Sequence, residues 1–164
     1  MIIALISGIH GHRKKPDSAL KAVEHAAVLS CLGNICSSSI TRGLSEGFSD
    51  PIHVVFVNND GDLFRITQTA KNFTNITLHG GITELLQNGK RITHYDTAVR
   101  MLAPSDTYVL ICFGHTLTYE VSHHKKTLLS YPGEAMGELA EGGSCVLYSP
   151  ETNTSTKTMN SEAS

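Results

Sequence analysis

The chain has 164 residues, of which 40% are hydrophobic and 17% are charged, and its formal net charge is −2 with histidine neutral. This length and composition predict one compact globular domain and exclude a chain that is disordered throughout. The near-zero charge also excludes a strongly basic nucleic-acid binder and gives no reason to expect a membrane surface as a partner.

In the first half, short apolar runs alternate with helical patterns and are separated by glycine, proline or polar residues. A helix is expected after Pro16, where Leu20, Val23 and Ala27 recur at helical spacing. The expected strands are Met1–Ser7, a strand end at Cys31–Gly33 and Ile52–Val57, and the other expected helices are residues 40–49 and Leu63–Ala70.

The second half is richer in strands. Asn88-Gly89 between two strand-like runs predicts a hairpin of Ile82–Leu86 and Lys90–Thr93. A helix over Thr97–Ala103 is expected to stop at Pro104. The remaining expected strands are Tyr108–Phe113, Tyr119–His123, Thr127–Ser130 and Cys145–Tyr148.

The composition changes near residue 150. Residues 150–164 are rich in Ser, Thr, Asn and Glu, and Met159 is their only large apolar residue. We therefore expect one mixed α and β domain over residues 1–149, followed by a disordered tail over residues 150–164.

The sequence favours a cytoplasmic protein. The apolar run Met1–Ile6 lacks the basic leader of a signal peptide, and no run approaches the length of a membrane span. The four cysteines form no CxxC pair, so free thiols in a reducing compartment are expected.

Polar residues that can bind metal follow five successive strands. Because loops at strand ends converge in layered α/β proteins, these residues predict one site. The blocks are Gly8-Ile9-His10-Gly11, Gly33-Asn34, Val57-Asn58-Asn59-Asp60-Gly61, Thr93-His94-Tyr95-Asp96 and Gly114-His115-Thr116-Leu117, and Tyr131-Pro132-Gly133-Glu134 precedes the last strand.

The order and intervals of these blocks over residues 1–149 resemble the calcineurin-like metallophosphoesterases, in particular their small bacterial and archaeal phosphodiesterase branch. The resemblance implies a four-layer αββα sandwich, in which two mixed β-sheets are flanked by helices. It also implies a two-metal site at the strand ends, where divalent ions activate water and polarise a phosphoester.

Carried over residue by residue, the resemblance implies an incomplete first metal site. The family has an aspartate where this chain has Gly8, a bridging aspartate at Asn34 and a histidine at Leu117, and only His10 is retained. For the second site it implies Asn34, Asn58, His94 and His115 as ligands, so that only the bridging negative charge is missing.

These changes predict one ion or none rather than two, because a +2 ion would face only neutral ligands. Mn²⁺, Ni²⁺ or Zn²⁺ is expected, and imidazole suits the last two in particular. Asp60 and Asp96 are close enough in sequence to supply a carboxylate, whereas Val57 and Tyr95 replace family glycines and are expected to crowd the phosphate pocket.

Three functions remain open at this point. The first is a phosphodiesterase or phosphatase with an altered, single-metal site and weak activity. The second is an inactive member of the fold that serves as a protein-interaction scaffold, alone or as a homo-oligomer. The third is a module that binds a phosphorylated ligand or a metal without turnover. The expected small-molecule partner is a phosphoester.

Overall fold

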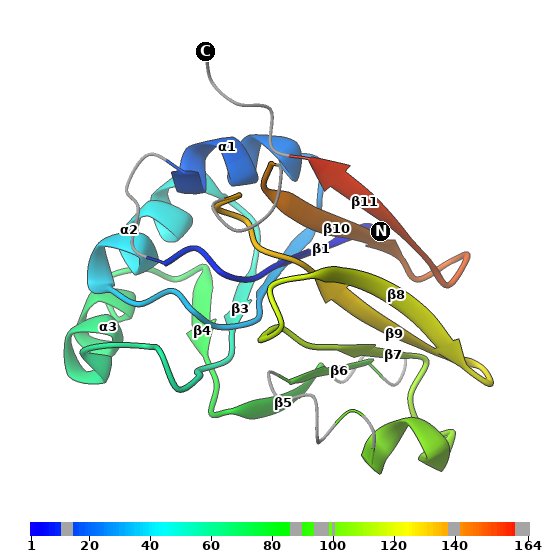
Figure 1. The fold of residues 1–164 in the computed structure, drawn as a ribbon. Coiled ribbons are helices and arrows are strands. Elements are labelled where there is room, and N and C mark those ends of the chain that lie inside the picture. Colours follow the sequence, from blue (N-terminus) through cyan, green and yellow to red (C-terminus); the bar gives the residue numbers. More distant parts are fainter. Residues whose placement is uncertain (11–14, 86–89, 94–98, 100, 138–141, 160–164) are drawn as a thin grey trace.

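Two β-sheets pack face to face and helices lie outside them in the computed structural model, which describes all residues except 11–14, 86–89, 94–98, 100, 138–141 and 160–164 (Figure 1). This is the predicted α/β four-layer sandwich. The two sheets are mixed, because each combines parallel and antiparallel strand pairs.

The larger sheet has six strands in the order β11-β10-β1-β2-β3-β4. Strands β1 to β4 run parallel, and β10 and β11 join them as antiparallel strands beside β1. The bounds are β1 Ile3–Ile6, β2 Val28–Cys31, β3 Ile52–Val54, β4 Ile76–Leu78, β10 Ser144–Ser149 and β11 Thr154–Met159.

The smaller sheet has five strands in the order β5-β6-β7-β9-β8. Strands β6, β7 and β9 run parallel, and β5 and β8 are antiparallel edges. The bounds are β5 Ile82–Leu85, β6 Lys90–Thr93, β7 Leu110–Cys112, β8 Tyr119–His124 and β9 Thr127–Pro132.

Three α-helices cover the outer face of the larger sheet: α1 (Lys15–Ala22), α2 (Ser38–Gly47) and α3 (Leu63–Ala70). Their apolar faces share one buried cluster with every second residue of the sheet, as strand alternation requires. Residues with the opposite parity, such as Leu5 and Val146, pack between the two sheets with Leu110 and Leu128.

A thinner layer covers the outer face of the smaller sheet, where Val99 and Ala103 pack against Ile111, Phe113 and Tyr131. The α-helical residues end at Leu102, and Pro104 lies inside the 3-10 helix η1 (Ala103–Ser105) that follows, so the prediction that the helix stops near Pro104 is confirmed. Proline is tolerated there because the first helical turn leaves its backbone N–H groups unbonded. Within the expected helix over Thr97–Ala103, Val99, Met101 and Leu102 are helical, and residues 97, 98 and 100 lie outside the described residues.

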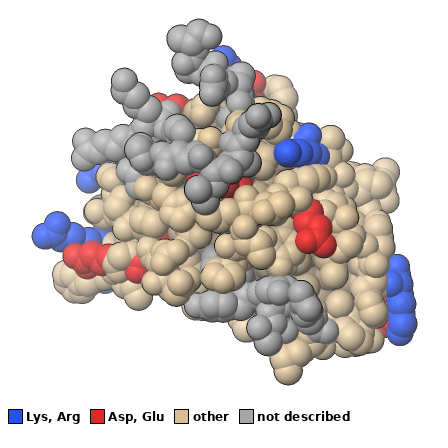
Figure 2. All heavy atoms as spheres, viewed as in Figure 1, with Lys and Arg blue, Asp and Glu red and all other residues tan. Residues whose placement is uncertain are grey.

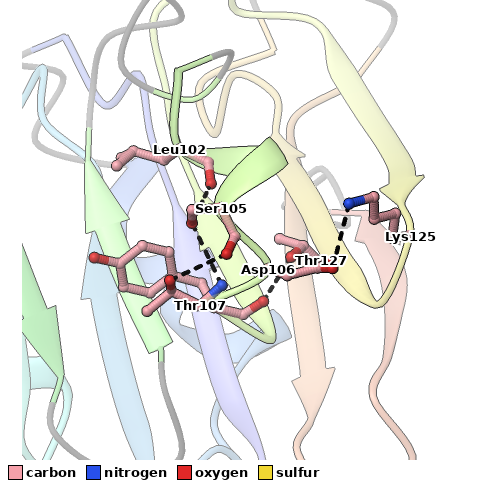
Figure 3. Close-up of polar contacts among 7 residues, drawn as sticks. Leu102, Ser105, Asp106, Thr107, Lys125 and Thr127 are labelled. Carbon is pink, nitrogen blue, oxygen red and sulfur yellow. Dashed lines mark hydrogen bonds and ion pairs between the residues drawn. The ribbon is translucent and has the colours of Figure 1, made fainter.

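The amino ends of β7 and β9 are tied together at the end of the smaller sheet opposite His115 (Figure 3). The Thr127 hydroxyl donates to the Tyr108 carbonyl over 2.6 Å, and Lys125 Nζ lies 3.4 Å from Asp106 Oδ2. These contacts hold the β8–β9 hairpin against the loop that follows η1.

The structure differs from the sequence prediction at the C-terminal end. Thr154–Met159 forms β11 and pairs along its whole length with β10, from Ser149↔Thr154 to Ser144↔Met159. Disorder is therefore a wrong prediction for these residues. A polar edge strand needs ladder hydrogen bonds more than buried side chains, and composition does not detect this.

Charged side chains are sparse on the face of the molecule shown in Figure 2. Lys and Arg lie mainly near its margins, and uncharged residues cover most of the described surface. The helices that the structure describes are too short or too polar to cross a membrane.

Candidate functional site

The loops after β1, β2 and β7 meet at the carboxyl ends of these strands. Gly114, directly after β7, lies so close to Ser7 and Leu32 that an added Cβ would overlap the Ser7 side chain. The same Cβ would lie 2.7 Å from the Leu32 carbonyl oxygen, which is backbone and cannot move aside. The predicted convergence of these strand-end blocks on one rim is therefore observed for the described residues.

His10 and Asn34 lie side by side at this rim. The His10 backbone N–H donates to the Asn34 carbonyl over 3.0 Å, and both residues have left-handed backbone, with φ of 43° and 57°. Their side chains contribute two buried polar atoms, His10 Nε2 and Asn34 Oδ1, that have no hydrogen-bond partner among the described residues. A buried polar group without a partner costs about 1–3 kcal/mol, so these two atoms mark the place where a ligand would be stabilised.

Asp60 holds the loops after β2 and β3 together. Its carboxylate is 9% exposed and accepts three backbone N–H groups. Oδ1 accepts from Ile35 over 2.8 Å and from Cys36 over 3.0 Å, and Oδ2 accepts from Val57 over 2.8 Å. Asp60 therefore orders the Asn34 loop, which is a different role from the replacement metal ligand that the sequence suggested.

Leu117 fills the space beside Gly8. An added Cβ at Gly8 would lie 3.0 Å from Leu117 Cδ2 and 3.3 Å from Glu134 Cγ, and Gly8 has a φ of 66°. Two of the three positions at which the first predicted metal site lost a ligand, Gly8 and Leu117, thus lie next to each other. A leucine methyl group and a glycine Cα occupy this part of the site.

The backbone beyond Glu134 runs along the same loop. Ala135 N–H donates to the Ser7 carbonyl over 2.8 Å, and Met136 N–H donates to the Gly8 carbonyl over 3.3 Å. Glu134 is 2% exposed, so a carboxyl group is buried beside Gly8. Sequence reasoning did not assign Glu134 to the site; its place directly after Pro132-Gly133 was the available signal.

Asn58 and His115 lie at the exposed side of the rim, in contrast to His10 and Asn34. Asn58 Nδ2 donates to Asn59 Oδ1 over 3.4 Å. His115 has a φ of 139°, in the region that favours glycine. The predicted ligand His94, together with Tyr95 and Asp96, lies outside the described residues.

Val57 packs against another residue of the strand-end blocks. Its methyl groups pack against Gly33, where any added Cβ would overlap them. Gly33 has a φ of 81°, so the close approach and the left-handed turn both require glycine.

The described rim holds no cluster of the side chains that most often bind metal. Within the described residues, no group of three or more His, Cys, Asp and Glu side chains is close enough to hold a metal. The buried atoms without a partner in the described rim, His10 Nε2 and Asn34 Oδ1, are neutral donors, and the nearby buried carboxyl group is that of Glu134, beside Gly8.

Comparison with known proteins agrees with this architecture. The sequence model of the calcineurin-like phosphoesterase superfamily domain matches residues 1–153. No match was found among the curated protein sequences.

Solved structures resemble the chain over nearly its full length. An archaeal phosphodiesterase superposes with a TM-score of 0.87 at 20% identity, covering 97% of this chain and 99% of its own. The phosphoesterase YfcE from E. coli has a TM-score of 0.65 at 14% identity and coverage of 98% and 100%. Vps29 from Entamoeba histolytica, in complex with Zn²⁺, has a TM-score of 0.67 at 18% identity and coverage of 100% and 95%. At these identities the likeness concerns the fold, and the match of the family model over residues 1–153 places the chain in the calcineurin-like phosphoesterase superfamily.

Proposed function

We propose that the chain is a metal-dependent phosphodiesterase or phosphatase with a degraded first metal site and a single divalent ion. Family membership and the fold shared with an archaeal phosphodiesterase support phosphoester chemistry. The ligands we propose are Asn58, His94 and His115, with Asn34 and His10 completing the site. Mn²⁺, Ni²⁺ and Zn²⁺ are the candidate ions.

The contact between Leu117 and Gly8 is the observation that supports one ion. An ion at the first position would need a ligand from each of these residues, and they offer only a methyl group and a hydrogen atom. The two residues are so close that a Cβ added at Gly8 would lie 3.0 Å from Leu117 Cδ2. The contact therefore accounts for two of the ligands missing at the first position, where His10 and Asn34 remain as neutral donors.

The chain's own residues then have separate tasks. A bound ion would supply Lewis acidity towards a phosphoryl oxygen. His10 Nε2 and Asn34 Oδ1 offer buried lone pairs inside the rim, and the exposed His115 can approach a substrate from the solvent side. Asp60 and Gly114 keep the loops that carry these donors in place.

Metal analysis combined with hydrolysis of bis-p-nitrophenyl phosphate tests this proposal. Purified protein should retain no more than one Mn²⁺, Ni²⁺ or Zn²⁺ per chain, and His115→Ala should weaken that binding. His123→Ala, which changes an exposed histidine in β8 away from the rim, is the matched control. Two ions per chain, or equal metal affinity of the His115→Ala variant and the control, would contradict the proposal.

Rebuilding the missing ligands tests the degraded site directly. The triple variant Gly8→Asp, Asn34→Asp and Leu117→His should gain strong Mn²⁺-dependent hydrolysis. Gly8→Asp alone should show no such gain, because Leu117 supplies no ligand and its Cδ2 would lie 3.0 Å from the new Cβ. Rapid hydrolysis by the unaltered chain, with no gain from the triple change, would refute a degraded site.

A protein-interaction scaffold is the second candidate. The fold shared with Vps29 proteins from two organisms supports it, and so does an exposed apolar pair at the start of α3, where Phe64 is 72% and Leu63 46% exposed. Absence of hydrolysis and of metal binding in both the unaltered chain and the triple variant would favour this function. A cytoplasmic location remains our proposal; the four cysteines are free thiols in the structure.

A further inference from the structure

A chain of hydrogen-bonding side chains joins the two sheets at one edge of the sandwich. His53 lies in β3, His79 follows β4, and Thr83 lies in β5 of the other sheet. His53 Nδ1 and His79 Nε2 are 3.0 Å apart, and His79 Nδ1 and Thr83 Oγ1 are also 3.0 Å apart. We call these three residues the inter-sheet histidine chain.

The position of His53 directs it between the sheets. Its neighbours Ile52 and Val54 pack in the cluster under the helices, so strand alternation places His53 on the opposite face. Its register partner on β2 is Ser30, whose hydroxyl is buried and has no hydrogen-bond partner among the described residues. The inter-sheet layer is therefore apolar around Leu5 and Val146 and polar at this edge.

The number of protons on the two imidazoles decides whether both hydrogen bonds of the inter-sheet histidine chain can form. With both imidazoles neutral, one ring nitrogen of each facing pair donates and the other accepts, so both 3.0 Å contacts are satisfied. One added proton is also accommodated, because a charged His79 can donate to His53 and to Thr83. A second proton places N–H groups of two cations face to face at 3.0 Å, and the His53–His79 hydrogen bond is then lost.

No neighbouring carboxylate among the described residues offsets that charge. The groups that face His53 from β2 and β4 are Ser30 and Thr77, which are neutral. On β5, Glu84 points to the face opposite Thr83 by alternation, and its carboxylate accepts from the Tyr108 hydroxyl over 2.7 Å. On β6, the register partner of Thr83 is Ile92, whereas Arg91 pairs with Glu84.

The electrostatic environment agrees with this geometry. Burial, and secondarily the charge of His79, lower the pKa of His53, and burial lowers the pKa of His79. Both imidazoles therefore resist protonation in the closed structure more than they would in water, where histidine titrates near about 6.5.

We propose that the inter-sheet histidine chain is an acid-sensitive latch, which holds β5 of the smaller sheet against β3 and β4 of the larger one and releases it as pH falls below neutrality. Release frees the edge strand β5 from the larger sheet and lets it separate from β6, its partner in the ladder, and β6 leads directly to His94. None of the proposed metal ligands belongs to the latch, so its hydrogen bonds form whether or not the chain hydrolyses phosphoesters.

The direction and size of the pH effect on opening follow from the linkage between proton binding and opening. The open form binds more protons than the closed form, so opening becomes more favourable as pH falls from about 6.5, and closure is fully restored above it. Between pH 7.5 and 5.5 the opening equilibrium should rise up to about tenfold for each imidazole, and up to about 100-fold for the pair.

Native-state hydrogen exchange of the full chain tests the latch. We compare protection factors, which correct for the pH dependence of intrinsic exchange, for β5 amides and for β1 amides at pH 7.5 and 5.5. In the unaltered chain, β5 protection should fall tenfold to 100-fold while β1 protection stays within about twofold. The double variant His53→Asn and His79→Gln keeps amide nitrogens near Nδ1 and Nε2 but cannot titrate, so its β5 protection should not follow pH.

Two control variants show whether the pH response of β5 protection comes from His53 and His79. His25→Asn removes a histidine whose side chain is 93% exposed, and this variant should behave as the unaltered chain does. Thr83→Val leaves the two imidazoles in place and should lower β5 protection at both pH values without abolishing the pH response. Equal pH responses of β5 in the unaltered chain and the double variant would overturn the latch. A response that disappears when a chelator is added would also overturn it, in favour of a metal held between the two histidines.

Discussion

Replacing Asp60 by asparagine should destabilise the protein far more than its size suggests. The carboxylate of Asp60 accepts backbone N–H groups from Ile35, Cys36 and Val57 at 2.8 to 3.0 Å. An asparagine oxygen can replace Oδ1, but its NH₂ group would then face the Val57 N–H, donor against donor. Flipping the amide would instead leave the N–H groups of Ile35 and Cys36 without an acceptor.

The magnitude follows from these three bonds. A hydrogen bond to a charged group contributes about 1.5–3 kcal/mol, and a neutral one about 0.5–1.5 kcal/mol. Asp60→Asn removes one charged bond and neutralises the other two, so the free energy of unfolding should fall by about 4 kcal/mol. For a chain of this length that corresponds to a melting temperature lower by roughly 8–16 °C.

Urea denaturation followed by far-UV circular dichroism measures this difference. Asp62→Asn is the matched control: Asp62 is an exposed N-cap whose side chain accepts from Arg65 N–H at 3.0 Å and forms an ion pair with Arg65 Nε at 3.3 Å, which contributes little because both side chains are exposed. Asparagine caps helices as well as aspartate does, so the control should lose less than about 0.5 kcal/mol. If Asp60→Asn costs no more than Asp62→Asn, the three-bond account of Asp60 is wrong.

Three further predictions concern other parts of the molecule. Gly114→Ala should lower the melting temperature by roughly 4 °C or more in differential scanning calorimetry, because its methyl group would overlap Ser7 and crowd the Leu32 carbonyl; an unchanged value would contradict the close approach. Deleting the residues after Asn153 should lower the melting temperature, because it removes β11 and exposes the edge of β10. An unchanged melting temperature in thermal denaturation would show that β11 does not stabilise the fold. Of the four cysteines, only Cys36 should react with Ellman's reagent under native conditions, because the other three are buried. Its reaction should be slow at pH 7, because burial raises the pKa of the Cys36 thiol and little thiolate forms at that pH. Rapid labelling of more than one thiol at pH 7 would refute this.

Sequence pattern located most elements because their signals are local. The helix Leu63–Ala70 has the predicted bounds, since Asp62 caps its first turn and Ile66 and Ala70 face the core. The hairpin strands β5 and β6 pair antiparallel from Ile82↔Thr93, as the Asn-Gly signal indicated. Strand β4 (Ile76–Leu78) was not predicted, because three residues carry too little periodicity to stand out.

The arrangement inside the site depends on contacts between distant residues, and sequence pattern does not report these. Gly8 and Leu117 look like two separate losses in the sequence, whereas the structure places the Leu117 methyl group against Gly8. In the sequence, Asp60 is a carboxylate close to Asn58, so it is interpreted there as a replacement metal ligand. Its three backbone partners became visible only when the loop after β2 was placed beside it.

The backbone conformation and the unpaired polar atoms of the rim lower the stability of the fold, and this bears on the choice between an enzyme and a scaffold. His10, Asn34, Cys36, His115 and Leu117 all have positive φ, in a backbone region that disfavours non-glycine residues by about 1–2 kcal/mol each. The orphaned His10 Nε2 and Asn34 Oδ1 add a further desolvation cost of about 1–3 kcal/mol each. The remaining stability must offset both, and Asp60 and Gly114 hold the loops in this costly shape. A ligand that satisfies the two buried atoms would recover part of the cost, whereas a partner that docks on an outer surface such as the start of α3 would recover none. The strained geometry of the rim therefore favours a function in which something binds at His10 and Asn34.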